Sequence, residues 1–263
     1  MLNILLPLLM TIGCHAEIQE EIQPVEYEII NPGKEQLGEL EFPTEPGTRW
    51  EYNVFIKDNK GKIYKVVDWV ENTSLEKGLL IRNLSFHSLN GDKLEKHLLK
   101  KTFSTQNGLS LKRVVAELVN KKDENPLKIT HTPAARVFPK ILHKDYHETQ
   151  TIRSQSSFED STTIQDIKVI NREDLTIKAI IYKDCVIITH TCLTKYETFQ
   201  SKTSSKFWFK PGIGIVKFHY NDGETDTTWI LKSFKKLNLD ISSTLRHREP
   251  VLRVTLARLN KTR

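Results

Sequence analysis

Two histidines four residues apart are the first candidates for chemistry in this sequence. His143 and His147 would share one face of a helix, which is how the histidines of many zinc hydrolases approach their metal. That pattern places a glutamate directly after the first histidine, and here Lys144 holds the position. A third ligand would have to come from a loop, as His131 could. The pair is therefore a weak metal candidate, and a solvated polar face is the competing interpretation.

Cys185, His190 and Cys192 form a second group of metal-ligand types, but their spacing matches no familiar zinc motif. The two cysteines could instead form a disulfide in an oxidising compartment. Their separation of seven places them on opposite faces of a straight strand, because side chains alternate along a strand. A disulfide therefore requires a bend near residues 189–191, and a buried cysteine on a strand pair is the alternative.

Gly212 and Gly214 raise the question of a phosphate-binding loop. A dinucleotide fingerprint needs a third glycine and a following helix, but Lys217 holds that third position and a β pattern follows. Pro211 precedes the pair, and Pro-Gly is typical of a tight turn. We interpret Pro211, Gly212 and Gly214 as a turn motif between two strands, and we expect no cofactor.

The elements that would position these residues are strands. Residues 48–58 alternate between the two faces of a strand, and Asn-Gly pairs at 90–91 and 107–108 are hairpin signals. Residues 110–122 also fit helical spacing. We therefore predict a mainly all-β, antiparallel protein, either a sandwich or a curved open sheet, with room for one short helix.

The first sixteen residues predict export. An apolar run over residues 2–12 is too short to span a bilayer and suits the core of a signal peptide. Gly13-Cys14 resembles the site at which bacterial lipoproteins receive lipid on cysteine, which would tether the chain to a membrane through Cys14. The alternative is cleavage after Ala16 by ordinary signal peptidase, which would leave a periplasmic or secreted protein.

Charge divides the rest of the chain. Residues 17–45 contain nine acids against the single base Lys34, whereas residues 241–263 contain six bases against Glu249. We predict a signal segment at 1–16, an acidic tether at 17–42, a basic β domain at 43–240 and a basic tail at 241–263. A basic domain could meet an anionic envelope ligand, although a solvated lysine-rich surface has the same composition. We do not expect a nucleic-acid partner.

Three short islands of the sequence carry a family resemblance. Gly47, Trp50 and Tyr52 make a Gly-x-x-Trp-x-Tyr start, residues 184–186 read Asp-Cys-Val, and an aromatic strand leads into Pro-Gly-Ile-Gly-Ile-Val-Lys at 211–217. This pattern resembles poorly characterised exported bacterial proteins, many of them lipoproteins. The resemblance implies an antiparallel β domain in the cell envelope, and it implies no catalytic residues.

These observations favour a non-enzymatic protein of the bacterial envelope, held by lipid and serving a binding or structural role. One alternative is an envelope hydrolase or metalloenzyme that uses His143 and His147. A second is a periplasmic or secreted protein that binds a hydrophobic, lipid-like ligand on clustered aromatic side chains, which core packing explains equally well.

Overall fold

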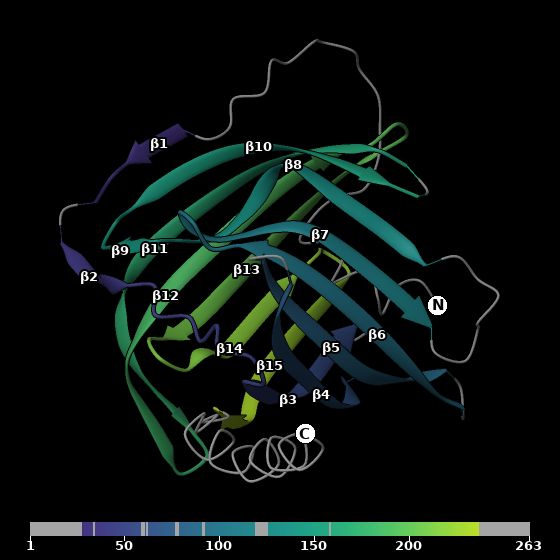
Figure 1. The fold of residues 1–263 in the computed structure, drawn as a ribbon, viewed down its shortest axis with the longest axis horizontal. Coiled ribbons are helices and arrows are strands. Elements are labelled where there is room, and N and C mark those ends of the chain that lie inside the picture. The colour runs from purple at the N-terminus through teal and green to yellow at the C-terminus, as the bar shows by residue number, and fades with distance from the viewer. Residues whose placement is uncertain are drawn as a thin grey trace, which may run out of the picture.

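The computed structural model describes residues 28–33, 35–58, 61, 63–76, 79–90, 93–118, 126–157 and 159–236 (Figure 1). Within these residues the chain forms fifteen strands and no helix, so no described helix could cross a membrane. The first eight strands are β1 (Glu28–Asn31), β2 (Gln36–Glu39), β3 (Arg49–Asp58), β4 (Ile63–Glu76), β5 (Leu79–Asn90), β6 (Lys93–Ser104), β7 (Gly108–Leu118) and β8 (Leu127–Pro139). The remaining strands are β9 (Ile141–His143), β10 (His147–Ser156), β11 (Ser161–Ile177), β12 (Ile180–Lys195), β13 (Gln200–Lys210), β14 (Gly214–Asn221) and β15 (Thr225–Lys235).

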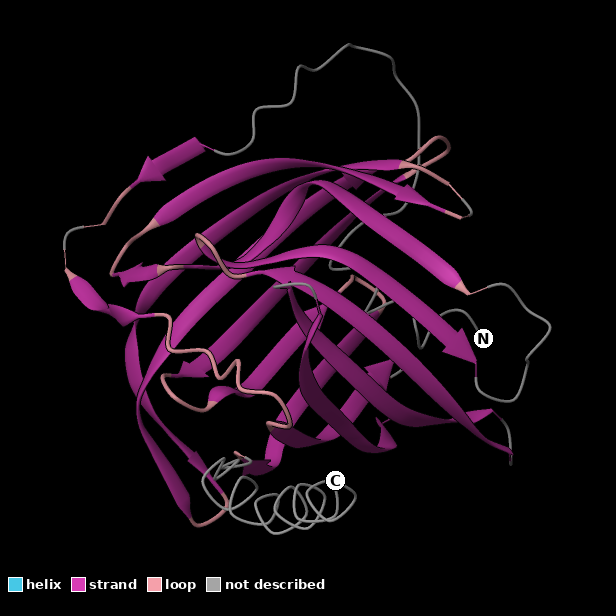
Figure 2. Ribbon diagram, viewed as in Figure 1, coloured by secondary structure: helices cyan, strands magenta, loops and turns pink. Residues whose placement is uncertain are grey.

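The strands form two antiparallel meanders that join into one curved sheet (Figure 2). β3 to β8 pair in sequence order, as do β10 to β15, and β15 pairs with β3. On the other side β8 pairs with the last part of β10, where Ser154 lies opposite His131. All strands of the 13-stranded sheet except β1 therefore form a ring. The predicted all-β, antiparallel class is confirmed, and the sheet is curved and closes on itself.

The core lies inside this ring because side chains alternate along each strand. In β14 the buried and partly buried positions alternate without interruption, and Val216, Phe218 and Tyr220 are the buried side chains. Aromatic rings form a chain across the interior: Phe207 contacts Phe218 with centroids 4.7 Å apart, and Phe218 contacts Trp229 edge-on at 5.3 Å. The interior is thus packed by aromatic side chains from neighbouring strands.

Two of the sequence islands meet in the structure. Pro211 and Gly212 lie in the turn between β13 and β14, and Gly212 has a φ of 75°. The Trp50 indole N–H donates to the carbonyl oxygen of Ile213 at 2.6 Å, and the Tyr52 hydroxyl lies 3.1 Å from the carbonyl oxygen of Ile215. The Trp-x-Tyr pair on β3 therefore holds the Pro-Gly turn from inside the ring.

The helix suggested for residues 110–122 is not present in its described part, because residues 110–118 belong to strand β7, and residues 119–122 lie outside the described residues. The pairing of β7 with β8 changes register between Leu111 and Arg113, which places Leu111 and Val114 on the same buried side although they are three apart. A bulge therefore produced the spacing that resembled a helix.

The folded domain begins before residue 43. β1 pairs with β10, β2 pairs with β9, and Leu37 and Phe42 are buried in the core. The second half of the predicted tether is thus part of the domain. The first part of that tether, the signal segment with Cys14, and the basic tail at 241–263 lie outside the described residues.

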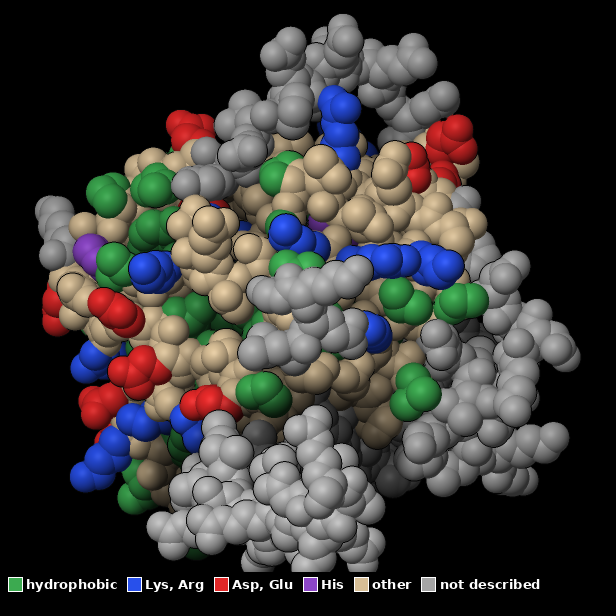
Figure 3. Space-filling view, viewed as in Figure 1, with side chains coloured by type: hydrophobic (Ala, Val, Ile, Leu, Met, Phe, Trp, Pro, Cys, Tyr) green, Lys and Arg blue, Asp and Glu red, His purple; other side chains and the backbone are tan. Residues whose placement is uncertain are grey.

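Acidic and basic side chains are interspersed on the face of the molecule that Figure 3 shows. Figure 3 shows lysine and arginine side chains spread over one face among aspartate and glutamate, rather than gathered in one patch. On this face, the positive charge of the domain has no single focus.

Candidate functional site

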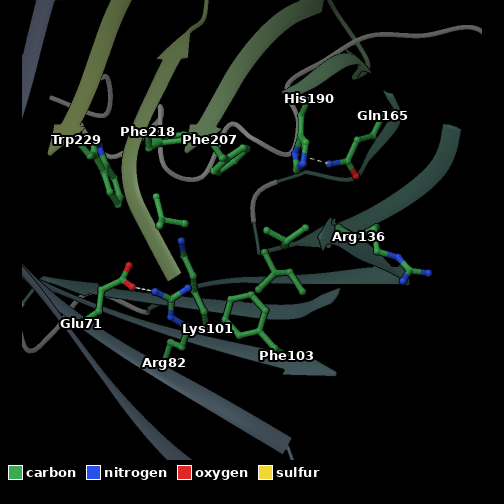
Figure 4. A pocket seen from close by; sticks show the side chains of 14 residues that line it. Glu71, Arg82, Lys101, Phe103, Arg136, Gln165, His190, Phe207, Phe218 and Trp229 are labelled. Atoms are coloured by element: carbon green, nitrogen blue, oxygen red, sulfur yellow. Dashed lines mark hydrogen bonds and ion pairs between the residues drawn. The ribbon is translucent and has the colours of Figure 1, made fainter. Parts of the chain in front are cut away.

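A cavity of about 100 Å³ lies among inward-facing side chains of the ring (Figure 4). Its lining comes from strands of both meanders, β4 to β8 and β11 to β15. The lining residues are Glu71, Arg82, Lys101, Phe103, Leu111, Ala135, Arg136, Val137, Gln165, His190, Phe207, Ile215, Phe218 and Trp229. A space lined by apolar and aromatic side chains with a few polar groups is the usual form of a small-molecule site.

Four rings make up the aromatic wall of this cavity, and they belong to β6, β13, β14 and β15. They are Phe103, Phe207, Phe218 and Trp229. All four side chains are at least nine-tenths buried. The wall therefore offers a molecule of matching size a dry, apolar surface.

Opposite part of this wall, Arg82 on β5 forms a buried ion pair with Glu71 on β4. The guanidinium also lies 4.8 Å from the ring centre of Phe42 and 5.0 Å from that of Trp50. Burial lowers the pKa of Arg82 to about 10, so this group stays positively charged at neutral pH. A carboxylate and two aromatic faces thus hold Arg82 in place.

Lys101 on β6 lies next to this pair and is half-buried beside the cavity. Burial, and secondly the positive charge of Arg82, lower the pKa of Lys101 to about 7. Within the described parts of the chain, no hydrogen bond or ion pair joins its ammonium to another residue. Figure 4 shows the side chain extending from beside Arg82 toward Phe218 and Trp229.

The far side of the cavity is polar and internally paired. Arg136 lies 3.5 Å from the carboxylate of Glu148, which also accepts a hydrogen bond from the Tyr146 hydroxyl at 2.5 Å. The Gln165 side-chain nitrogen lies 3.2 Å from Nδ1 of His190. Burial lowers the pKa of His190 to about 4, so its imidazole is neutral at neutral pH. This side of the cavity therefore adds polar contacts whose charges are already balanced.

The histidines proposed from the sequence do not assemble into a metal site. His143 ends β9, while His147 begins β10 and lies 3.5 Å from a carboxylate oxygen of Asp166, so the two do not share a helix face. His131 lies on β8, buried, with Nδ1 3.0 Å from the Ser154 hydroxyl. Among the described residues, no three or more His, Cys, Asp or Glu side chains form a group that could hold a metal ion.

The cysteine cluster also divides between two faces of β12. Cys185 and Cys192 are both buried and both reduced, so the disulfide considered from the sequence is not formed. Cys192 shares the inward face with His190, whereas Cys185 lies on the other face, where its thiol donates to the carbonyl of Tyr182 at 3.3 Å. Burial raises the pKa of Cys185 to about 11 and that of Cys192 to about 12. Both therefore remain protonated and unreactive at neutral pH.

Sequence reasoning missed the charged residues of the cavity, although a signal for them exists. Arg82 lies two residues from Leu80 and Leu84, and Lys101 lies two residues from Leu99 and Phe103. In a strand, residues two apart face the same way. A lysine or arginine that lies two residues from buried apolar residues on either side along a strand is therefore predicted to point into the core.

Comparison with known proteins gives two solved structures of related shape. No protein-family model matches the chain, and no curated protein matches it. A protein from Bacteroides fragilis NCTC 9343, described as exported and as having a YmcC-like fold, is 13% identical with a TM-score of 0.43. The match covers 75% of this chain and 100% of that one. A protein from Parabacteroides distasonis ATCC 8503, described as a lipoprotein, is 16% identical with a TM-score of 0.43, covering 75% and 99% of the two chains.

Proposed function

We propose that this chain is an exported protein of the bacterial envelope, held to a membrane by lipid on Cys14, whose β domain binds a small molecule inside its closed sheet. The observation that carries the binding role is the cavity, with its aromatic wall and the ammonium of Lys101. The Gly13-Cys14 sequence after an apolar run supports the anchored location.

The composition of the cavity favours binding over a purely structural core. Protein interiors are close-packed, and a buried polar group without a partner costs free energy. Here the ring encloses an open space and places a lysine beside it instead of another apolar side chain. A ligand that filled the space would restore close packing, and a negative group on it would pair with the half-buried lysine.

The same lining favours binding over catalysis. It supplies aromatic faces and positive charge, while its histidine is held neutral beside Gln165. The buried His131–Ser154 pair has the residue types of a nucleophile and its base, but neither residue lines the cavity. Nε2 of His131 has no hydrogen-bond partner to orient the ring, which an activated pair would need.

One preparation tests both parts of the proposal. The protein is extracted from the membrane fraction of the cells that produce it, and its mass is measured under denaturing and under native conditions. We expect the denatured mass to show loss of residues 1–13 and gain of diacylglyceryl and acyl groups, with neither change in a Cys14→Ser control. We expect the native mass to exceed the denatured mass by that of one small molecule.

The two parts can fail separately. A chain without lipid in the soluble fraction would contradict the anchor and leave the binding role standing. Equal native and denatured masses in repeated mild preparations would contradict the binding role.

A further inference from the structure

Among the described residues, the charges that line the cavity leave one cation, Lys101, without a paired carboxylate. Glu71 neutralises Arg82, and Glu148 lies against Arg136. A cation that is half-buried beside an aromatic wall attracts an anion more strongly than one in water, because the local dielectric is lower. The charge pattern therefore has room for one negative group.

We propose that the ligand is a small organic anion, a short-chain monocarboxylate, whose carboxylate pairs with the ammonium of Lys101 and whose alkyl body lies against the aromatic wall. This inference rests on the binding part of the proposed function and is independent of the lipid anchor.

The position of Lys101 supports this orientation. Its side chain starts beside the Glu71–Arg82 pair and extends toward Phe218 and Trp229 (Figure 4). A carboxylate that met the ammonium would have its alkyl group directed into the part of the cavity lined by rings. The apolar body gains dry surface while its charge gains a partner, which is the arrangement expected of an amphipathic ligand.

The size of the cavity limits the ligand. A water molecule occupies roughly 30 Å³ of liquid, and an engineered apolar cavity of roughly 150 Å³ accepts benzene. The cavity of about 100 Å³ therefore fits a molecule of about five non-hydrogen atoms, the size of propionate. A long fatty acid would fit only with part of its chain outside this cavity.

Arg82 is expected to act as a positioning residue rather than as a direct contact. Its guanidinium is committed to Glu71 and covered by the rings of Phe42 and Trp50. After burial, which is the larger cause, its charge also lowers the pKa of the neighbouring Lys101 in the empty site. In the empty site, the Lys101 ammonium can therefore lose its proton near neutral pH, and a bound anion would favour its protonated form.

Binding should accordingly weaken as the pH rises. Among the described residues that line the cavity with Lys101, the charged groups are Glu71, Arg82 and Arg136, and the titratable neutral group is His190, whose pKa of about 4 keeps it uncharged. With the pKa of Lys101 at about 7, the protonated fraction of the empty site falls about twofold from pH 6 to 7, about fivefold from pH 7 to 8 and about ninefold from pH 8 to 9. The apparent Kd should rise by the same factors.

The test is calorimetric titration of the purified full chain with sodium propionate at pH 6, 7, 8 and 9. Lys101→Met removes the charge and keeps the length of the side chain, and we expect it to weaken binding at pH 6 at least tenfold and to abolish the dependence on pH. Lys206→Met is the matched control, because Lys206 lies over Trp208 outside the cavity lining and should leave both quantities unchanged. Thermal unfolding verifies that each variant folds.

The outcomes separate this inference from the proposed function. If Lys101→Met folds and retains both the affinity and the pH dependence, the inference is wrong. If propionate does not bind while the native mass reveals a neutral or cationic ligand, the inference fails and the binding role stands. If propionate does not bind and native masses show no ligand, both are wrong.

Discussion

Replacing Gly108 by alanine should destabilise the fold, because the new Cβ would collide with backbone atoms, which cannot turn aside as a side chain can. Gly108 begins β7 with a φ of 100°, a conformation that residues with a Cβ rarely adopt. A Cβ built there would lie 2.3 Å from the carbonyl oxygen of Phe138 and 2.7 Å from the amide nitrogen of Lys140. Both atoms belong to the backbone on either side of Pro139, the residue of β8 that pairs with Gly108. The strand itself would therefore have to move.

Two costs add at this position. A residue with a side chain held in a left-handed conformation costs about 1–2 kcal/mol. Forcing an extra methyl group into packed surroundings costs about 1–3 kcal/mol more. The free energy of unfolding should therefore fall by about 2–5 kcal/mol in Gly108→Ala, a large part of the stability of a typical domain.

Gly223 supplies the matched control. It has a φ of 90°, and a Cβ there would meet nothing within 4 Å, so Gly223→Ala should carry only the conformational cost of about 1–2 kcal/mol. Urea unfolding followed by tryptophan fluorescence measures both variants against the parent chain. Equal losses at the two positions would refute the argument, because only the contact with β8 distinguishes them.

Two further predictions concern buried polar groups. Burial lowers the pKa of His131 and His190 to about 4, so the unfolded chain, with imidazole pKa values near 6.5, binds more protons between those limits. The free energy of unfolding should therefore reach its full value above pH 6.5 and fall by up to about 3 kcal/mol per histidine toward pH 4. In urea unfolding at several pH values, His190→Gln should reduce this fall in the free energy of unfolding. A His190→Gln variant that shows the same fall as the parent chain would contradict the prediction. Trp50→Phe should lower the free energy of unfolding by about 1–3 kcal/mol, because it leaves the partly buried carbonyl of Ile213 without its 2.6 Å donor. Trp208→Phe, whose donor reaches the exposed residue Glu173, should cost less, and the reverse order in urea unfolding would contradict this account.

Local patterns predicted the strands because those strands obey local rules. Residues 49–58 of the alternating stretch form β3, and in the Asn-Gly pair Asn107 lies in the turn after β6 while Gly108 begins β7. Pro211 and Gly212 lie between β13 and β14, where Gly has the positive φ that such a turn requires. Each of these features depends on residues close together in the chain.

The closure of the sheet into a ring could not be predicted from such local patterns. It depends on β15 meeting β3 and on β8 meeting β10, and the first of these joins residues far apart in sequence. The same reason hid β1 and β2, since Leu37 and Phe42 are single apolar residues in an acidic segment until β9 and β10 provide pairing partners. The bulge in β7 also changed the spacing that alternation predicts.

The cavity is where local and global preferences disagree most clearly. Arg82 and Lys101 hold inward positions that alternation assigns to apolar residues. For Arg82 the fold offsets the cost of burial with Glu71 and with the rings of Phe42 and Trp50. For Lys101 it offers no such partner, and it places the cation beside an open space instead of a carboxylate. Proteins tolerate conflicts of this kind chiefly at functional sites. An apolar residue at position 101 would therefore be expected to stabilise the empty protein while it removes the site for an anion.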